Sequence, residues 1–276
     1  MRYSVVFFVF FTLGTASVLA QFSPVLNEYE KDLQQRFAEI VPLMPDSIKI
    51  KHNNYIEKHM TDALSMAEAF FYPFDSLKNI GKITSRDQKL RLLTWNLLYS
   101  DGTHQYYGFV LYRPDNKAKH FLLRLTDRSA TIENPEMLTL DTENWFGALY
   151  YEIIEKKWDG VTLYTLLGYD PNNMFISKKI IDNLYFREDS IPVFGAPVFK
   201  KNNAFLHRII FEYSARVSMS LRYNQDLKMI VFDHLSPAKP SYTGSYQFYG
   251  PDFSFDAFKF TDDHWELVED IDMRNR

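Results

Sequence analysis

Residues 207–237 contain short apolar runs separated by polar turns, and this pattern limits the fold more than any other feature of the chain. Apolar and polar side chains alternate with a period of two in residues 209–214 and again in residues 217–223. That period is typical of strands with one buried face. A polar turn then leads to a third apolar run, residues 229–232. We therefore expect three strands in this stretch.

Polar side chains within this stretch and just after it are the candidates for a ligand site. If the first two strands pair as a hairpin, Glu212 and Arg222 share a face and meet directly or diagonally. We favour a structural ion pair, and a polar floor in a ligand pocket is the alternative. The candidate ligand-binding residues are Glu212, Arg222, Asp233, His234, Tyr249 and Asp252.

The same succession of short runs and turns extends over most of the chain. Strands are expected at residues 90–99, 105–112, 120–126, 146–155, 161–168 and 178–186, with a helix as the alternative for the last range. Residues 127–144 are polar and predict a long connection or a single short helix. The pattern predicts a mainly β fold, in which an antiparallel meander forms an irregular barrel or sandwich. A regular propeller is not favoured, because no strict repeat emerges.

Two amphipathic helices are expected ahead of these strands. Apolar residues at helical spacing predict a helix over residues 27–40 and a second over residues 54–70. The predicted organisation is a signal peptide at residues 1–20, a helical N-terminal segment at residues 21–76 and an all-β domain at residues 77–276.

The first 20 residues predict export. Arg2 is followed by an apolar run that is too short for a membrane span of about 20 residues, and then by small residues. We expect cleavage before Gln21, and an uncleaved anchor is the alternative. The absence of cysteine excludes disulfides and thiol nucleophiles, which favours an exported bacterial protein, periplasmic or extracellular. No other long apolar run exists, so we expect no membrane span after cleavage.

Several blocks of the sequence together resemble one protein family. They are SRDQKLRLLTWN (85–96), DGTHQYYG (101–108), WFGALYYE (145–152), YTLLGYDPNN (164–173), KIIDN (179–183), FGAPVF (194–199) and FYGPD (248–252). The set resembles a family of uncharacterised exported proteins from Bacteroidetes-type bacteria, over residues 80–275. The resemblance implies an exported protein with a single β-rich unit, and it implies no activity.

Charge and motif content argue against several classes of function. The net charge is −4 and no basic stripe is present, so we do not expect nucleic-acid binding. The chain has no nucleophile elbow, phosphate loop, dinucleotide fingerprint or zinc-protease motif. Asp170 begins a run that partly imitates a calcium loop, but the distal glutamate is missing, which favours a turn. We expect neither a cofactor nor a metal.

No catalytic signature remains, so the sequence favours a binding or structural module with an unidentified ligand over an enzyme. One alternative is an exported hydrolase with a carboxylate-based site that uses Glu212, Asp233 or Asp252. Another is an assembly subunit that presents the aromatic residues of the tail, 242–258, to a partner protein. The alternation of these aromatic residues favours burial in the core.

Overall fold

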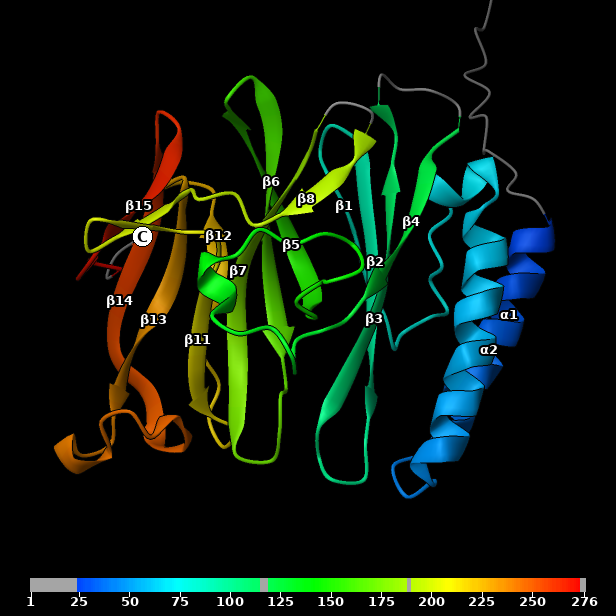
Figure 1. The fold of residues 1–276 in the computed structure, drawn as a ribbon, viewed down its shortest axis with the longest axis horizontal. Helices are drawn as coiled ribbons and strands as arrows, with labels where there is room; N and C mark the ends of the chain where they lie inside the picture. Colours follow the sequence, from blue (N-terminus) through cyan, green and yellow to red (C-terminus); the bar gives the residue numbers. More distant parts are fainter. Residues whose placement is uncertain (1–23, 115–118, 188–189, 274–276) are drawn as a thin grey trace, which may run out of the picture.

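The computed structural model describes residues 24–114, 119–187 and 190–273. These residues form a stack of layers, in which a pair of helices covers the first of three β-sheets and the sheets lie face to face (Figure 1). The fold is mainly β and almost entirely antiparallel, and the described sheets stay open. The predicted mainly β fold is therefore confirmed, with the sandwich alternative rather than the barrel.

The helical layer consists of α1 (Pro24–Glu39) and α2 (Asp46–Leu64), followed by the 3-10 turn η1 (Ala67–Phe70). The two predicted helices are confirmed, but α2 begins well before residue 54. Its first turns bury Lys49, which donates to the Leu98 carbonyl at 2.8 Å, and Asn53, which accepts a 2.8 Å bond from the Trp95 indole. These partners lie far away in the sequence, so helical spacing did not reveal this part of the helix.

The first sheet is a meander with strand order β1-β2-β3-β4. Its strands are β1 (Gly81–Thr84), β2 (Leu90–Leu98), β3 (His104–Tyr112) and β4 (Phe121–Thr126). The last three match the predicted strands, and β1 is an additional edge strand. Both faces of this sheet are buried, so β2 is buried along nearly its whole length, including the polar residues Arg91 and Thr94.

The second sheet has the strand order β11-β7-β6-β5, and β8 pairs with the end of β7. Its strands are β5 (Leu149–Trp158), β6 (Val161–Asp170), β7 (Ile176–Phe186), β8 (Pro192–Phe194) and β11 (Ile209–Ser214). Residues 178–186, for which the alternative prediction was a helix, thus belong to the strand β7. The long connection before β5 contains the short 3-10 turn η3 (Pro135–Met137), as one of the two sequence alternatives anticipated.

The third sheet has the order β10-β9-β15-β14-β13-β12. Its strands are β9 (Phe199–Lys201), β10 (Ala204–Leu206), β12 (Leu221–Asn224), β13 (Met229–Pro237), β14 (Tyr249–Thr261) and β15 (His264–Val268). The segment between β13 and β14 contains the 3-10 turns η5 (Pro240–Tyr242) and η6 (Tyr246–Phe248).

The hairpin considered for residues 209–223 does not form. Strand β11 pairs with β7 in the second sheet, and β12 pairs with β13 in the third. The apolar faces of the two sheets meet instead, with the ring centroids of Phe211 and Phe232 4.6 Å apart. Residues 215–220 therefore cross from one layer to the next, because burying two sheet faces against each other removes more apolar surface from water than one hairpin does.

Separate hydrophobic cores fill the spaces between the described layers. Trp95 and Phe109 lie between the helices and the first sheet, Trp145 and Tyr150 between the first and second sheets, and Trp265 in the core shared by the second and third. Among the described residues, no helix has the length and apolar character that crossing a membrane requires.

Candidate functional site

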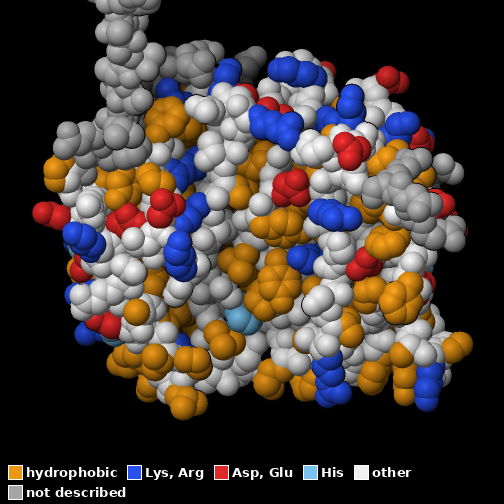
Figure 2. All heavy atoms as spheres, turned by 180° about the vertical axis from the view of Figure 1, so that it is seen from behind, with side chains coloured by type: hydrophobic (Ala, Val, Ile, Leu, Met, Phe, Trp, Pro, Cys, Tyr) orange, Lys and Arg blue, Asp and Glu red, His pale blue; other side chains and the backbone are white. Residues whose placement is uncertain are grey.

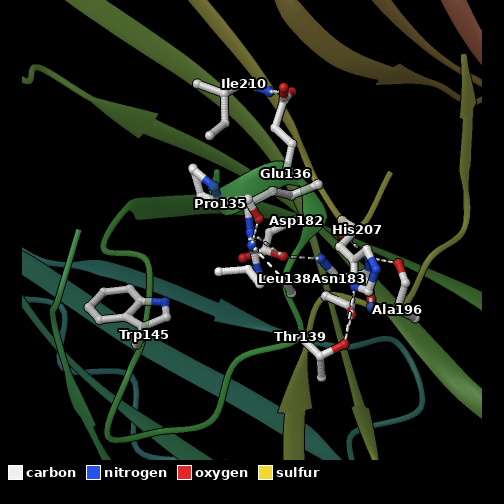
Figure 3. Close-up of polar contacts among 12 residues, drawn as sticks. Pro135, Glu136, Leu138, Thr139, Trp145, Asp182, Asn183, Ala196, His207 and Ile210 are labelled. Atoms are coloured by element: carbon white, nitrogen blue, oxygen red, sulfur yellow. Dashed lines mark hydrogen bonds and ion pairs between the residues drawn. The ribbon is translucent and has the colours of Figure 1, made fainter. Parts of the chain in front are cut away.

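A buried ion pair anchors the long connection before β5 to the second sheet. Arg208, just before β11, and Asp182, on β7, are both fully buried, and Arg208 Nε lies 3.3 Å from Asp182 Oδ1. The same guanidinium donates to the carbonyls of Pro135 and Leu138. Figure 3 shows this cluster beneath the connection. The buried guanidinium of Arg208 therefore holds the backbone of η3 in place through its bonds to these two carbonyl oxygens. Its charge is stabilised by the same oxygens and by the Asp182 carboxylate.

A second group of hydrogen bonds fixes the neighbouring loop. The side chain of Asn183 accepts a 2.6 Å bond from Ala196 N and donates to the His207 carbonyl at 2.8 Å. The His207 ring lies 2.7 Å from the Gly195 carbonyl, which also accepts a bond from Thr139 (Figure 3). These bonds hold the surrounding backbone in place, while Nη2 of the neighbouring Arg208 is buried without a hydrogen-bond partner among the described residues.

A cleft of about 460 Å³ lies on η3, the turn that the Arg208 guanidinium holds in place. It lies between the connection that contains η3, the strands β7, β10 and β11, and the turn η6. Its polar lining consists of Ser129, Asn134, Glu136, Lys178, Glu212 and Tyr246. Phe146, Ile132 and Ile210 contribute apolar walls. A concave site with a few converging polar groups is typical of a small-molecule binding site.

The charged groups of the cleft come from three separate segments. Glu136 accepts a 2.9 Å bond from the backbone N–H of Ile210, and Figure 3 shows its side chain directed toward that residue. Burial raises the pKa of the Glu136 carboxyl above its ordinary value. Lys178 on β7 lies beside Glu212 on β11, with 3.6 Å between Nζ and Oε1. Two carboxyl groups and one ammonium group therefore face the same space.

A row of charged residues continues from the cleft into the interior. Asp170 on β6 is the direct neighbour of Lys178 across the sheet, and Lys178 is the neighbour of Glu212. Asp170 is almost fully buried and accepts a hydrogen bond from the hydroxyl of Tyr106 in the first sheet. Burial raises the pKa of Asp170, and the bond from Tyr106 opposes that rise. The backbone N–H of Asn172 also binds this carboxylate, as the turn interpretation of this run predicts.

Of the predicted ligand-binding residues, Glu212 lies in the cleft. Arg222 is exposed on β12, in a different sheet from Glu212, so the ion pair considered between them does not form. Asp233 accepts a 2.7 Å bond from Ser220 N, and His234 pairs with Asp256 at 2.7 Å. Both lie within β13, which extends beyond the predicted apolar run 229–232 to Pro237.

The remaining two predicted residues lie on β14, outside the cleft. The hydroxyl of Tyr249 accepts a bond from Gly244 N, and the carboxylate of Asp252 accepts bonds from Ser236 and Ser254. The bonds from Gly244 and Ser254 are local, and the bond from Ser236 joins β13 to β14. Among the described residues, no group of three or more His, Asp or Glu side chains has the arrangement of a metal site.

Sequence patterns did not identify Glu136, Lys178, Asp182 or Arg208 as site residues. Glu136 lies in the polar connection 127–144, and Lys178 and Asp182 lie on a strand whose alternation is poor. One signal was present: a long polar connection in a compact β fold is frequently functional.

Comparisons with known protein families, with curated proteins and with solved structures found no match. The fold and the cleft are therefore the basis for classifying this chain, which is a layered β-sandwich protein with a polar cleft at one sheet edge.

Proposed function

We propose that this chain is an exported binding protein and that its cleft takes a small hydroxyl-rich ligand of the saccharide class. The observation that carries the proposal is the convergence of Glu136, Lys178 and Glu212 on one cleft with an exposed aromatic ring, Tyr246, at its margin. Export is proposed from the character of residues 1–20, and membership of the exported Bacteroidetes-type family from the sequence blocks.

The chemistry of the lining favours hydroxyl groups. A hydroxyl donates one hydrogen bond and accepts others, so it needs both kinds of partner at close range. The carboxylate of Glu212 accepts, while the Lys178 ammonium and the Asn134 amide donate. The partly exposed ring of Tyr246 offers a surface for the apolar C–H face of a sugar ring.

The charge balance disfavours phosphorylated ligands. Lys178 is already paired with Glu212 at 3.6 Å, and Glu136 adds a second carboxyl group. Among the described residues that line the cleft, Lys178 is the one cation, so a phosphate placed here would face carboxylates with only a paired ammonium group to stabilise it. The bonds that hold η3 in place lower the ordering cost of binding a neutral polar ligand.

The test is isothermal titration calorimetry of residues 21–276 with a panel of neutral mono- and oligosaccharides, and with nucleotides for comparison. Glu212→Gln keeps the shape of the side chain and removes its charge. We expect it to weaken saccharide binding by about 10- to 100-fold, since a hydrogen bond to a charged group contributes about 1.5–3 kcal/mol. The matched control is Glu266→Gln, because Glu266 is paired with Lys200 in the third sheet, outside the cleft.

Binding of a saccharide that Glu212→Gln weakens and Glu266→Gln does not would support the proposal. If no saccharide produces heat, or if Glu212→Gln and Lys178→Met both bind as the wild type does, the saccharide site in this cleft is wrong.

Hydrolysis of a glycosidic bond is a second candidate function, and the raised pKa of Glu136 favours it. A carboxyl group with a raised pKa suits a general acid, and a second carboxylate in the same cleft supplies a base or nucleophile. Chromogenic glycosides measure this activity directly. Turnover that is abolished by both Glu136→Gln and Glu212→Gln would establish hydrolysis, whereas saccharide binding without turnover would leave binding as the function.

A further inference from the structure

The connections at one end of the molecule expose large hydrophobic side chains. This end lies at the bottom of Figure 1, where the α1–α2 connection, the β2–β3 and β6–β7 turns and the segment between β13 and β14 all reach the same level. We call it the tip surface, defined by Leu43, Met174, Phe175, Val217 and Phe248. The exposed fractions are 98% for Leu43, 69% for Met174 and 58% for Phe175, so folding alone leaves these side chains in water.

Hydrogen bonds and close packing join four of the connections at this end, from the α1–α2 connection to the β11–β12 connection. The carboxylate of Asp46, at the start of α2, accepts bonds from Ser100 in the β2–β3 turn. A Cβ on Gly102 of that turn would lie 2.7 Å from Met174 Cγ, so the Met174 side chain covers the turn. The N–H of Ala215 donates to the Phe175 carbonyl, which joins the β6–β7 turn to the β11–β12 connection.

The turns at the opposite end have a different composition. The β5–β6 turn is Asp159-Gly160, the β12–β13 turn contains Gln225-Asp226, and the β14–β15 turn is Asp262-Asp263. Short polar residues and glycine are the usual solution for a tight turn in water. Exposed hydrophobic residues occur near that end as well, as Phe121 and Ile191 show, but none of these three turns contains one. The apolar character of the tip surface is therefore not a general property of the turns in this fold.

The charges near the tip surface favour an anionic neighbour. The charge of Asp46 is balanced by Lys49, whereas Asp101 accepts bonds from Thr103 and keeps its negative charge. Arg216 and Lys239 lie exposed in the connections themselves. Figure 2 shows hydrophobic side chains along the lower edge of the molecule, interrupted by lysine or arginine side chains.

We propose that the tip surface docks on a lipid bilayer, with its hydrophobic side chains inserted between the headgroups and its basic side chains against lipid phosphates. Side chains that protrude singly from rigid turns need apolar surroundings on every side. A fluid bilayer interface supplies these surroundings without a preformed pocket for each residue, whereas a protein partner would need a matching pocket for each.

The test is flotation of residues 21–276 with vesicles of phosphatidylcholine alone and of phosphatidylcholine with phosphatidylglycerol. Residues 1–20 are left out, because their apolar run would itself bind lipid; every described residue is retained. We expect the wild type to float with both vesicles and more strongly with the anionic ones. The variant Leu43→Ser/Phe175→Ser/Val217→Ser changes one exposed side chain on each of three tips. We expect it to lower the partition coefficient by about 100-fold or more.

The matched control is Phe121→Ser/Ile191→Ser, which removes exposed hydrophobic side chains near the opposite end and should leave flotation unchanged. All five substituted side chains are at least partly exposed, so circular dichroism should show a folded protein in each case. The proposal is overturned if the wild type does not float, or if the tip variant floats as the wild type does. Self-association in sedimentation velocity that depends on the three tip residues, without flotation, would assign this surface to a protein contact and equally overturn docking on lipid.

Discussion

The buried ion pair between Arg208 and Asp182 is the strongest single constraint on the cleft, because it joins η3 to the second sheet. Removing one charge leaves the other without compensation in the interior. The hydroxyl of Tyr150, 3.3 Å from Asp182, would then be a weak substitute for the guanidinium. The pair therefore fixes the geometry of this region more than it adds to net stability.

Arg208→Met is expected to lower the free energy of unfolding by about 3–5 kcal/mol, because the Asp182 carboxylate remains buried without its cation. The double variant Arg208→Met/Asp182→Leu should recover most of this loss, since it removes both charges. Urea unfolding of the two variants and of Asp182→Leu measures the coupling. A single Arg208→Met variant with wild-type stability would contradict this account.

His234 gives the stability of the third sheet a dependence on pH. The hydrogen bond to Asp256 raises the pKa of His234 above its ordinary value of 6.5, while burial opposes the rise. Because the folded-state pKa is the higher one, the stabilisation is complete below pH 6.5 and is lost as pH rises through the folded-state pKa. The side chain is 44% exposed, so solvent screening limits the effect to below about 1 kcal/mol.

The measurement is urea unfolding of the wild type and of His234→Gln over this pH range. The wild type should be more stable at the acidic end, and the difference between the two proteins should shrink as pH rises. A difference that stays constant with pH would show that the contact between His234 and Asp256 does not change with protonation.

At the scale of elements, the connections position the cleft as much as the strands do. Gly195, just after β8, has a φ of +83°, and a Cβ there would lie 2.6 Å from the Leu138 carbonyl oxygen and 2.8 Å from Arg208 Nη2. Close packing of this backbone against η3 therefore requires glycine. In contrast, Gly160 in the β5–β6 turn has a φ of +77° and no atom within 4 Å of such a Cβ.

These two glycines separate the cost of backbone strain from the cost of a steric clash. Gly160→Ala is expected to lower the free energy of unfolding by about 1–2 kcal/mol, from the left-handed backbone alone. Gly195→Ala should lower it by at least about 2 kcal/mol more, since a carbonyl and a buried guanidinium must move. Chemical denaturation of both variants provides the comparison, and equal losses would contradict the close approach of Gly195 to η3.

The order of the strands along the chain was easier to predict than their partners. The three strands expected between residues 207 and 237 exist, although the second begins only at Leu221. The first of them joins the second sheet and the others join the third. Alternation is a local property of one strand, but the choice of sheet depends on which distant faces bury each other, as Phe211 and Phe232 do.

At the scale of the whole molecule, the first and second sheets are inner layers, and each of them contributes side chains to two hydrophobic cores. The first sheet packs on the helices and on the second sheet, which in turn packs on the third. Loss of one layer would expose an apolar face of the next, so we expect the described layers to unfold together.

Two tryptophans at opposite ends of the stack test this cooperativity. Trp95 donates to Asn53 in the first core, and Trp265 donates to Thr165 in the last, at 3.0 Å. Trp95→Ala and Trp265→Ala should each lower the free energy of unfolding by about 3–5 kcal/mol. Each should also shift a single transition, with circular dichroism and the fluorescence of the remaining tryptophans changing together. Two separate transitions in either variant would show that the layers unfold independently.

The sequence by itself determined the class of this protein. Periods of two and of 3.6 residues follow from local backbone geometry, so they predicted the strands, the helix pair and the mainly β fold. Only the tertiary structure decided which faces meet, and therefore what the cleft contains. Glu136, Lys178 and Glu212 come from a connection and two strands, and Glu212 alone was predicted as a site residue. Their convergence depends on the burial of Arg208 and Asp182 and on the packing of three sheets, which are interactions between residues far apart in the chain.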